Sequence, residues 1–268
     1  MAYYQNGLER DRLASGARRI EFLRMWDLLQ RHLPPPPAQV LDVGGGAGAY
    51  AIPLAAAGYE VHLVDPVPLH AEQAAQASHD AAVPLASITV GDARELRAAG
   101  ESCDVVLLLG PLYHLTSKDD RLTALCEARR VVRPGGTVVA KALSRFYPVF
   151  EGLTAGEWPR PDWMEKVAHF LGDGQYRNPA GDPGQFTTSY FHRPEELPGE
   201  IRDAGLDLRE FVAISGSLKL LPDLTRWLDS ADSRDHVLSL LRLLEAEPSL
   251  TGMSQNFLAI AQAPDRQP

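Results

Sequence analysis

The chain has 268 residues and is acidic, because 26 lysine and arginine residues stand against 35 aspartate and glutamate residues, for a formal net charge of −9. An apolar content of 45% and a charged content of 23% are typical of a globular protein and exclude disordered and fibrous classes. The acidic balance disfavours a nucleic-acid-binding protein, which usually presents a basic face.

The cysteines and the apolar runs exclude further kinds of protein. Cys103 and Cys126 are the only cysteines, and their spacing is not that of metal ligands or of a disulfide framework. The longest apolar run, 105–109, has the length of a strand and is too short to cross a membrane. We therefore expect a cytoplasmic protein without a metal, a membrane partner or a nucleic-acid partner. Whether it is a monomer or a homodimer stays open.

Residues 7–33 are predicted to form a helix, because their apolar residues recur at spacings of three and four. Four consecutive prolines at 34–37 then end this helix and form a stiff spacer. We expect residues 1–37 to be an N-terminal helical lid with a proline-rich spacer, followed by an α/β core over 38–143.

Within the core, short apolar runs alternate with segments of helical composition. Strands are predicted at 39–43, 60–65, 87–92, 103–110 and 137–143. Helices are predicted at 49–57, 69–79, 93–99 and 118–132. This alternation indicates βαβ units, which right-handed crossovers arrange as a parallel sheet with helices on both faces.

The alternation stops after residue 143. Residues 144–191 hold ten of the chain's twenty aromatic residues, and we expect them to form a cap inserted over the carboxyl edge of the sheet. The aromatic residues could line an apolar pocket or form the cap's own core. Strand-like runs return at 206–215 and 256–262, so 192–268 should supply helices and the last two strands. The predicted fold is α/β, a doubly wound, Rossmann-like sheet of seven mostly parallel strands.

The first predicted strand runs into a glycine-rich turn, Leu-Asp-Val-Gly-Gly-Gly-Ala-Gly at 41–48. Glycines there let the strand bend sharply into a helix and let a ligand approach the backbone closely. Gly44, Gly46 and Ala49 satisfy the dinucleotide fingerprint, and Asp65 lies at the distance expected of a ribose-binding acid. With Asp42 ahead of alternating glycines, the turn equally satisfies the pattern that binds S-adenosylmethionine (SAM). The turn alone leaves both ligand classes open.

Three further features favour SAM. Asp42 stands two residues before the first glycine, where it suits a cationic amino group better than a pyrophosphate. The third predicted strand ends in Val-Gly-Asp-Ala at 90–93, which places a second acid at the carboxyl edge, and a Pro-Gly-Gly turn at 134–136 precedes the fifth strand. On these motifs the chain resembles the class I SAM-dependent methyltransferases. The likeness is to the small-molecule branch that includes the ubiquinone and menaquinone biosynthesis C-methyltransferases.

The resemblance implies how SAM would be held. Asp42 and the glycines would line its methionine half, Asp65 would bind the ribose hydroxyls, and Asp92 would accept from the adenine amino group. The alternative is that these acids only cap the turns after their strands. In similar enzymes an N-terminal segment folds over the cofactor as a lid. The full set of implied SAM contacts is Tyr4, Arg12, Asp42, Gly44, Gly45, Gly46, Gly48, Asp65, Pro66, Asp92, Ala93, Leu109 and Gly110.

The fourth predicted strand leads into Gly-Pro-Leu-Tyr-His at 110–114, where similar enzymes place the methyl acceptor. Tyr113 or His114 could orient or deprotonate an acceptor, since histidine titrates near neutrality. His192 could face the same pocket from the cap. The alternative for each histidine is a helix cap or a contact without proton transfer. The segment lacks the amide or acid typical of enzymes that methylate the amines of bases.

We therefore predict a SAM-dependent methyltransferase that acts on a small-molecule acceptor, either a natural product or a quinone-like metabolite, and releases S-adenosylhomocysteine (SAH). Two alternatives stay open. An NAD-dependent oxidoreductase would use the overlapping glycine fingerprint, although Lys118 stands five residues after Tyr113 where such enzymes have four. A SAM-binding protein without transferase activity would need only the donor site.

Overall fold

The computed structural model describes residues 19–265 except 155, 157–160, 179–186 and 222. Tyr4 and Arg12, the predicted lid contacts, lie outside the described residues. The described part of the predicted first helix is α1 (Arg19–His32), which ends ahead of the four prolines. None of the described helices is long and apolar enough to cross a membrane.

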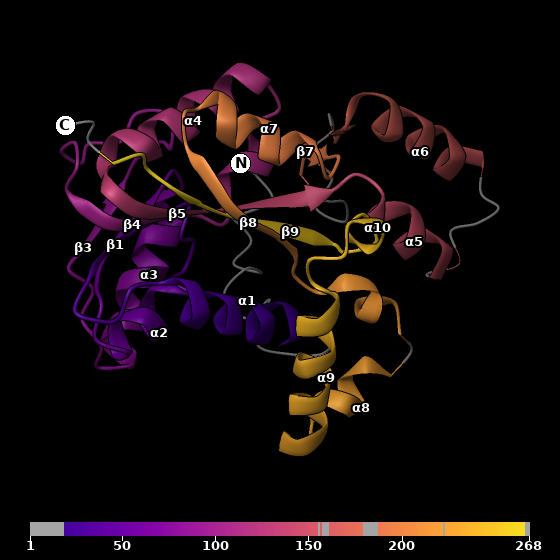
Figure 1. The fold of residues 1–268 in the computed structure, drawn as a ribbon, viewed down its shortest axis with the longest axis horizontal. Helices are drawn as coiled ribbons and strands as arrows, with labels where there is room; N and C mark the ends of the chain where they lie inside the picture. The colour runs from indigo at the N-terminus through magenta and orange to yellow at the C-terminus, as the bar shows by residue number, and fades with distance from the viewer. Residues whose placement is uncertain (1–18, 155, 157–160, 179–186, 222, 266–268) are drawn as a thin grey trace.

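A central sheet organises the fold (Figure 1). Its first five strands run parallel, and a later strand runs antiparallel beside β5. The main order is β3-β2-β1-β4-β5-β9-β8. Because the chain crosses from β3 to β4 on the other side of β1, the ends of β1 and β4 form the switch point where doubly wound sheets bind ligands. The strands are β1 (Gln39–Val43), β2 (Glu60–Asp65), β3 (Ser87–Val90), β4 (Cys103–Leu108), β5 (Val132–Ser144), β8 (Asp207–Ala213) and β9 (Asn256–Gln262).

The seven predicted strands are present, but the sheet formed by the described residues contains nine strands, so the predicted number was too low. The two additional strands form a hairpin of β6 (Gln175–Tyr176) and β7 (Ser189–His192). In this hairpin β7 pairs in parallel with Leu143 and Ser144 at the carboxyl end of β5. Since β9 occupies the other edge of β5, the hairpin lies beyond the end of β4.

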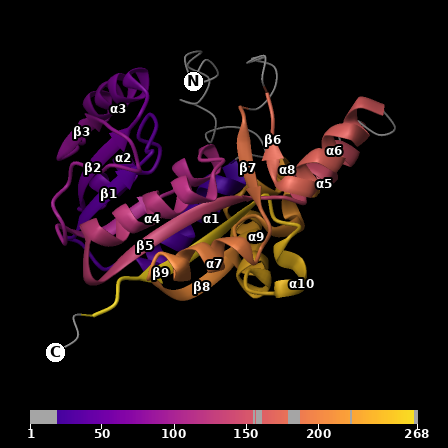
Figure 2. The same cartoon turned by 90° about the horizontal axis from the view of Figure 1, so that it is seen from above.

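Helices cover both faces of the sheet, as predicted (Figures 1 and 2). Each face has its own apolar core. Alternate residues of β4 divide between the two cores: Val105 and Leu107 face the first set of helices, and Val106 and Leu108 face the second. All four are fully buried, as expected of a central parallel strand. The first set is α1, α2 (Ala51–Ala56) and α3 (Pro68–Asp80), and the second is α4 (Lys118–Val131) and α7 (Glu196–Asp203).

The predicted helix at 93–99 is wrong. This segment consists of turns and an isolated bridge between Asp92 and Glu95. Asp92 Oδ1 accepts from the Arg94 backbone N–H at 2.9 Å, and Leu96 N donates to Glu127 on α4 at 2.8 Å. The Leu96 N–H is thereby bound to a side chain of another helix and not to a carbonyl one turn earlier in the chain.

The remaining described helices lie in the second half of the chain. In the predicted cap, α5 and α6 extend beyond the carboxyl end of β5, away from β3 (Figures 1 and 2). The division into lid, core and cap stays a prediction. These helices are α5 (Tyr147–Thr154), α6 (Pro161–Asp173), α8 (Leu224–Leu228), α9 (Ala231–Leu244), α10 (Pro248–Thr251) and the 3-10 turns η3 (Pro111–His114) and η4 (Gly216–Leu220).

Candidate active site

The glycine-rich turn follows β1 directly and is fastened to β2. Gly44, Gly46 and Gly48 have φ angles of 70°, 57° and 86°, which favour glycine. Gly44 N donates to Val64 O at 2.7 Å. A Cβ at Gly46 would meet no heavy atom of the described residues within 4 Å. The turn is therefore held in place while the space over Gly46 is open to a ligand.

The segment after β4 packs closely against this turn. A Cβ at Gly44 would lie 2.9 Å from Pro111 Cδ, and a Cβ at Gly110 would lie 3.0 Å from Gly44 O. Glycine at both positions is what allows the two segments to touch. Leu109, which precedes Gly110, is buried. The structure thus brings the glycine-rich turn and the Tyr113 segment together at one edge of the sheet, as the sequence predicts.

Asp65, at the end of β2, is buried and holds the glycine-rich turn to the start of α3. Its Oδ2 accepts from Gly46 N at 2.9 Å. Its Oδ1 accepts from Val67 N at 2.9 Å and lies 2.9 Å from His70 Nδ1. A carboxylate has about four acceptor positions, so one is left for a ribose hydroxyl. The ribose contact stays a prediction, and positioning of the turn is what the geometry displays.

Asp42, on β1, has an acceptor atom that lacks a partner. Its side chain is 1% exposed, and Oδ2 has no hydrogen-bond partner among the described residues. Burial, and then the charge of Asp65, raise the pKa of Asp42 to about 7, while Lys141 opposes the rise. A buried carboxylate without a partner is costly, and a cationic amino group would supply both the missing hydrogen bond and the missing charge. Asp42 therefore fits a ligand with an ammonium group.

The other predicted contacts with the adenosine half lie near the ends of β2 and β3. Asp92 is partly exposed and pairs with Arg94, whose Nη2 lies 2.7 Å from Oδ2. This hydrogen bond lowers the pKa of Asp92. Pro66 is exposed and Ala93 is buried. An adenine amino group would share the Asp92 carboxylate with Arg94, so this contact stays a prediction.

Tyr113 and His114 lie in η3, beside the glycine-rich turn. Their ring centroids are 4.4 Å apart, and Tyr113 is 9% exposed. Burial lowers the pKa of His114 to about 4, against the opposing effect of Asp65. The imidazole is therefore neutral at pH 7 and a weak base, which differs from the near-neutral titration that the sequence suggests. Tyr113 packs with Leu143 and Phe191, so η3 contacts the β6–β7 hairpin.

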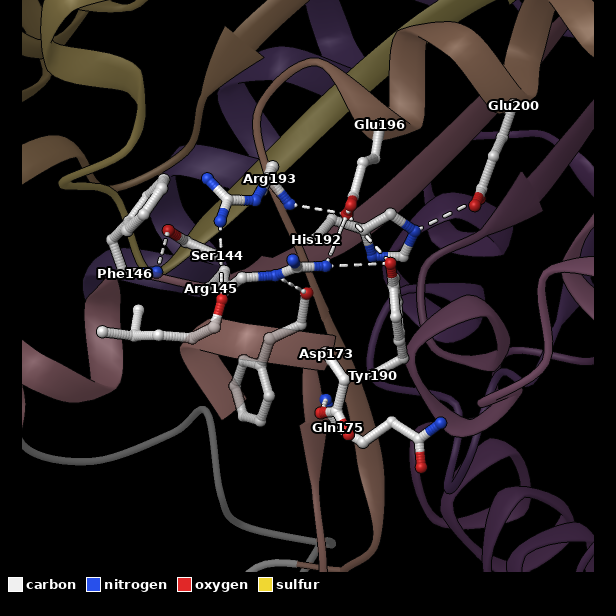
Figure 3. A network of polar contacts seen from close by, with 12 residues as sticks. Ser144, Arg145, Phe146, Asp173, Gln175, Tyr190, His192, Arg193, Glu196 and Glu200 are labelled. Atoms are coloured by element: carbon white, nitrogen blue, oxygen red, sulfur yellow. Dashed lines mark hydrogen bonds and ion pairs between the residues drawn. The ribbon is translucent and has the colours of Figure 1, made fainter. Parts of the chain in front are cut away.

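His192 lies in a buried polar network at the base of this hairpin (Figure 3). Its Nε2 is 3.2 Å from Glu200 Oε2 on α7, and its ring packs edge-on against Tyr190 at 4.8 Å. Burial lowers the pKa of His192. Glu200 also binds Arg121 of α4, with Nη2 at 2.7 Å. These contacts join the hairpin to two helices, and an acceptor contact for His192 stays a prediction.

Arg145, just after β5, holds the other side of the hairpin (Figure 3). Its Nε donates to Phe191 O at 3.0 Å, and its Nη2 donates to Tyr190 Oη and to Glu196 at 2.9 Å. The hairpin that covers Tyr113 is thus fixed by charge-assisted hydrogen bonds, which are stronger than neutral ones.

A buried ion pair between α1 and β5 at this edge of the sheet was also not identified from the sequence. Glu21 on α1 and Lys141 on β5 are 2% and 3% exposed, and Lys141 Nζ lies 3.0 Å from Glu21 Oε1. Lys141 Nζ is also 5.9 Å from the centroid of the Tyr113 ring. The available signal was a lysine inside the apolar run Val-Val-Ala-Lys-Ala-Leu at 138–143. Lysine is almost never fully buried unless it is paired.

Comparison with known proteins agrees with this geometry. Residues 41–140 match the model of a family described as a methyltransferase domain. A ubiquinone biosynthesis O-methyltransferase from Azorhizobium caulinodans is 30% identical over 218 residues, which cover 76% of this chain and 77% of that protein. The chain belongs to the class I SAM-dependent methyltransferases. The predicted resemblance to this family and to the ubiquinone biosynthesis methyltransferases is thereby confirmed, although these relatives are named O-methyltransferases and not C-methyltransferases. The NAD-dependent alternative is not favoured.

Two further similarities bear on how far the relationship extends. A protein of the same name from Cereibacter sphaeroides is 32% identical over 187 residues, or 67% of this chain, and the chain spans 64% of the length of that relative. A SAM-dependent methyltransferase from Methanosarcina mazei aligns over 89% of this chain and 98% of its own, with a TM-score of 0.60 and 16% identity. At that identity the likeness shows the fold.

The residues of this methyltransferase fit SAM, the cofactor of the family. The methionine part of SAM carries an ammonium group, which would be a partner for the Asp42 oxygen that has none among the described residues. The open space at Gly46 lets a ligand reach the backbone of the turn. Among the residues that the structure describes, no group of three or more His, Cys, Asp or Glu side chains is placed to hold a metal ion.

Proposed function

We propose that this methyltransferase transfers the methyl group of SAM to an oxygen atom of a small, quinone-like aromatic acceptor. The observation that supports the proposal is that a candidate donor site and a candidate acceptor site lie next to each other at one edge of the sheet. The buried, unpartnered Asp42 marks the donor half, and Tyr113 with its aromatic neighbours marks the acceptor half. Relatives named ubiquinone biosynthesis O-methyltransferases support oxygen as the acceptor atom and a quinone-like ring as the acceptor class.

The residues of the chain would act mainly by positioning. SAM, when bound, supplies an electrophilic methyl group on its sulfonium. Asp42 would pair with the amino group of the cofactor, and the backbone from Gly44 to Gly48 would line its methionine half. Tyr113, Leu143 and Phe191 would form an apolar wall that excludes water from the acceptor. Displacement at a sulfonium carbon depends chiefly on alignment and exclusion of water, which these contacts provide.

The cap supports an aromatic acceptor through one group of its aromatic residues. Phe170 and Tyr176 pack against Phe191 at 6.2 and 6.1 Å between ring centroids. Phe146 and Phe150 instead line a separate cavity of about 830 Å³ near α10. The predicted pocket-lining role therefore falls to the aromatic residues that adjoin Tyr113. A small-molecule acceptor, a cytoplasmic location and the absence of a nucleic-acid partner stay predictions.

A turnover assay tests this function. The purified protein is incubated with SAM that carries an isotopically labelled methyl group and with a panel of catechols, phenols and aromatic amines. SAH formation is quantified and the labelled product is located by mass spectrometry, with Cys126→Ser on the surface of α4 as a matched variant expected to retain activity. The proposal predicts label on a ring oxygen. Label on nitrogen or carbon would contradict the oxygen assignment, and turnover of none of the aromatic compounds would contradict the acceptor class.

A further inference from the structure

The buried ion pair between Glu21 and Lys141 stands where the acceptor would lie. Lys141 is one residue beyond Ala140, the partner of Leu108 at the end of β4, so it reaches the carboxyl edge beside η3. Its side chain leaves β5 on the same face as Val139, the face that α1 covers. Its ammonium group lies over the Tyr113 ring. No step of the proposed function uses this pair.

The Lys141 ammonium has more hydrogen-bond donors than the described residues around it have acceptors. An ammonium carries three donors, and among the described residues Glu21 is the one hydrogen-bond acceptor that it reaches. The side chain is 4% exposed, so solvent does not satisfy the other two donors. Replacing a buried ion pair by apolar residues is often neutral or stabilising, so folding stability alone does not account for this pair. The two remaining donors point to a ligand atom that accepts hydrogen bonds.

Several titratable groups surround Lys141 from different elements. The charge of Lys141 acts on Asp42 and on His114, and Glu21 acts on Tyr147 of α5. Lys141 thus interacts with one carboxylate on α1 and with one at the donor half, while η3 presents a neutral imidazole and a phenol. The groups that face Lys141 or its partner are Glu21 from α1, Asp42 from β1, Tyr113 and His114 from η3, and Tyr147 from α5.

We propose that Lys141 binds the ionised oxygen of the acceptor, and that Glu21 holds the ammonium in place for this contact. The inference rests on the proposed function and deepens it by naming the acceptor chemistry, an acidic hydroxyl such as that of a phenol or catechol. An oxygen nucleophile reacts faster as its anion, which a neighbouring cation favours. An amine gains positive charge as its bond to the methyl carbon forms, which the same cation disfavours. The pair therefore selects hydroxyl over amino acceptors.

The chemistry balances without any further reactant. The acceptor hydroxyl first loses its proton to solvent while its oxygen pairs with the Lys141 ammonium. The oxygen then forms a bond to the methyl carbon, and the carbon–sulfur bond of the sulfonium breaks with its electron pair on sulfur. An opposite charge at about 4–6 Å lowers the pKa of an acid by about 1–3. The same shift is expected for a phenol bound beside Lys141.

Ionisation of a bound chromophoric phenol tests the inference without turnover. The probe is 4-nitrocatechol in the presence of saturating SAH, and its absorbance is followed against pH with wild type, Lys141→Met and Lys141→Arg. The expected pKa of the bound probe is lowered in wild type and in Lys141→Arg, and is higher by at least 1 in Lys141→Met. Arg24→Met serves as a matched control, because Arg24 is a fully buried cation of α1 whose partners are Asp27 and Glu245.

Separate calorimetric titrations with SAH distinguish failure of the inference from failure of the proposed function. If neither the wild-type protein nor any variant binds SAH, the proposed function is refuted. If SAH binds normally while the probe has one pKa in wild type and Lys141→Met, the inference is overturned. It is also overturned if Lys141→Met loses SAH affinity and leaves the pKa of the probe unchanged, since Lys141 would then serve the cofactor carboxylate. The double variant Glu21→Gln with Lys141→Met removes both charges and replaces Lys141→Met if that variant does not fold.

Discussion

Replacing Asp42 by asparagine should make the stability of the variant, relative to wild type, increase as the pH rises. Burial raises the pKa of Asp42 from 3.8 to about 7, so the folded state holds this proton more tightly than the unfolded chain does. The contribution of Asp42 to stability is therefore fully present below about pH 4 and declines as the pH rises towards 7. The complete change corresponds to ~4 kcal/mol of unfolding free energy. Between pH 5 and pH 8 the decline amounts to roughly 2–3 kcal/mol.

Urea unfolding of wild type and Asp42→Asn at pH 5 and pH 8, without cofactor, measures this decline. A buried asparagine amide has a cost of its own, about 1–3 kcal/mol, but that cost does not depend on pH. Titration of other groups, such as His114, occurs in both proteins and cancels in the comparison. The stability difference should therefore move by roughly 2–3 kcal/mol in favour of asparagine between the two pH values. A difference that is the same at pH 5 and pH 8 would refute the argument.

Four further variants test the glycine-rich turn and the contacts of the β6–β7 hairpin. Gly46→Ala should lower Tm by only about 2–4 °C, because the new Cβ contacts no other atom of the described residues and the strain of a positive φ is about 1 kcal/mol. The affinity for SAH, in contrast, should fall at least about tenfold, because the Cβ occupies the space left for the ligand. Gly44→Ala should be less stable than Gly46→Ala by thermal melting, since its Cβ also overlaps the next segment, and the reverse order would show that the turn is placed wrongly. His192→Asn should lose less stability than wild type when the pH falls from 7.5 to 5.5. Burial lowers the pKa of His192, so in wild type the histidine binds a proton in the unfolded chain at a higher pH than in the folded protein. Equal losses of stability in the two proteins would contradict the burial of His192. Arg145→Lys should speed hydrogen exchange of the Phe191 amide, which donates to Gly174 O at 2.7 Å, and unchanged exchange would mean that Arg145 does not hold the hairpin.

Local pattern was sufficient for the main strands and for the donor half of the site. The strands at 39–43, 60–65 and 256–262 have the predicted bounds, because each is a short segment rich in Val, Leu, Ile or Ala that stands out from its polar or proline- and glycine-containing flanks. The glycine-rich turn was predictable for a similar reason. Its positive φ angles and its contact with Gly110 both require glycine, so the geometry of the turn can be recognised from the amino acids in the sequence.

What the sequence did not disclose depends on contacts between distant residues. Lys141 and Glu21 are 120 residues apart, and nothing local says that a lysine in an apolar run meets a glutamate on α1. His192 could not be placed because its environment is set by Glu200 and Arg121 from two other helices. The same holds for β6, since two residues carry no periodicity and pair only because β7 extends the sheet.

Calorimetric titration of the wild-type protein with SAH, and separately with NAD, tests the central claim most directly. The account predicts saturable SAH binding at one site per chain, with an affinity at least about tenfold weaker in Gly46→Ala, and no heat with NAD. Binding of NAD, or SAH binding that Gly46→Ala leaves intact, would contradict the placement of the cofactor on the glycine-rich turn after β1.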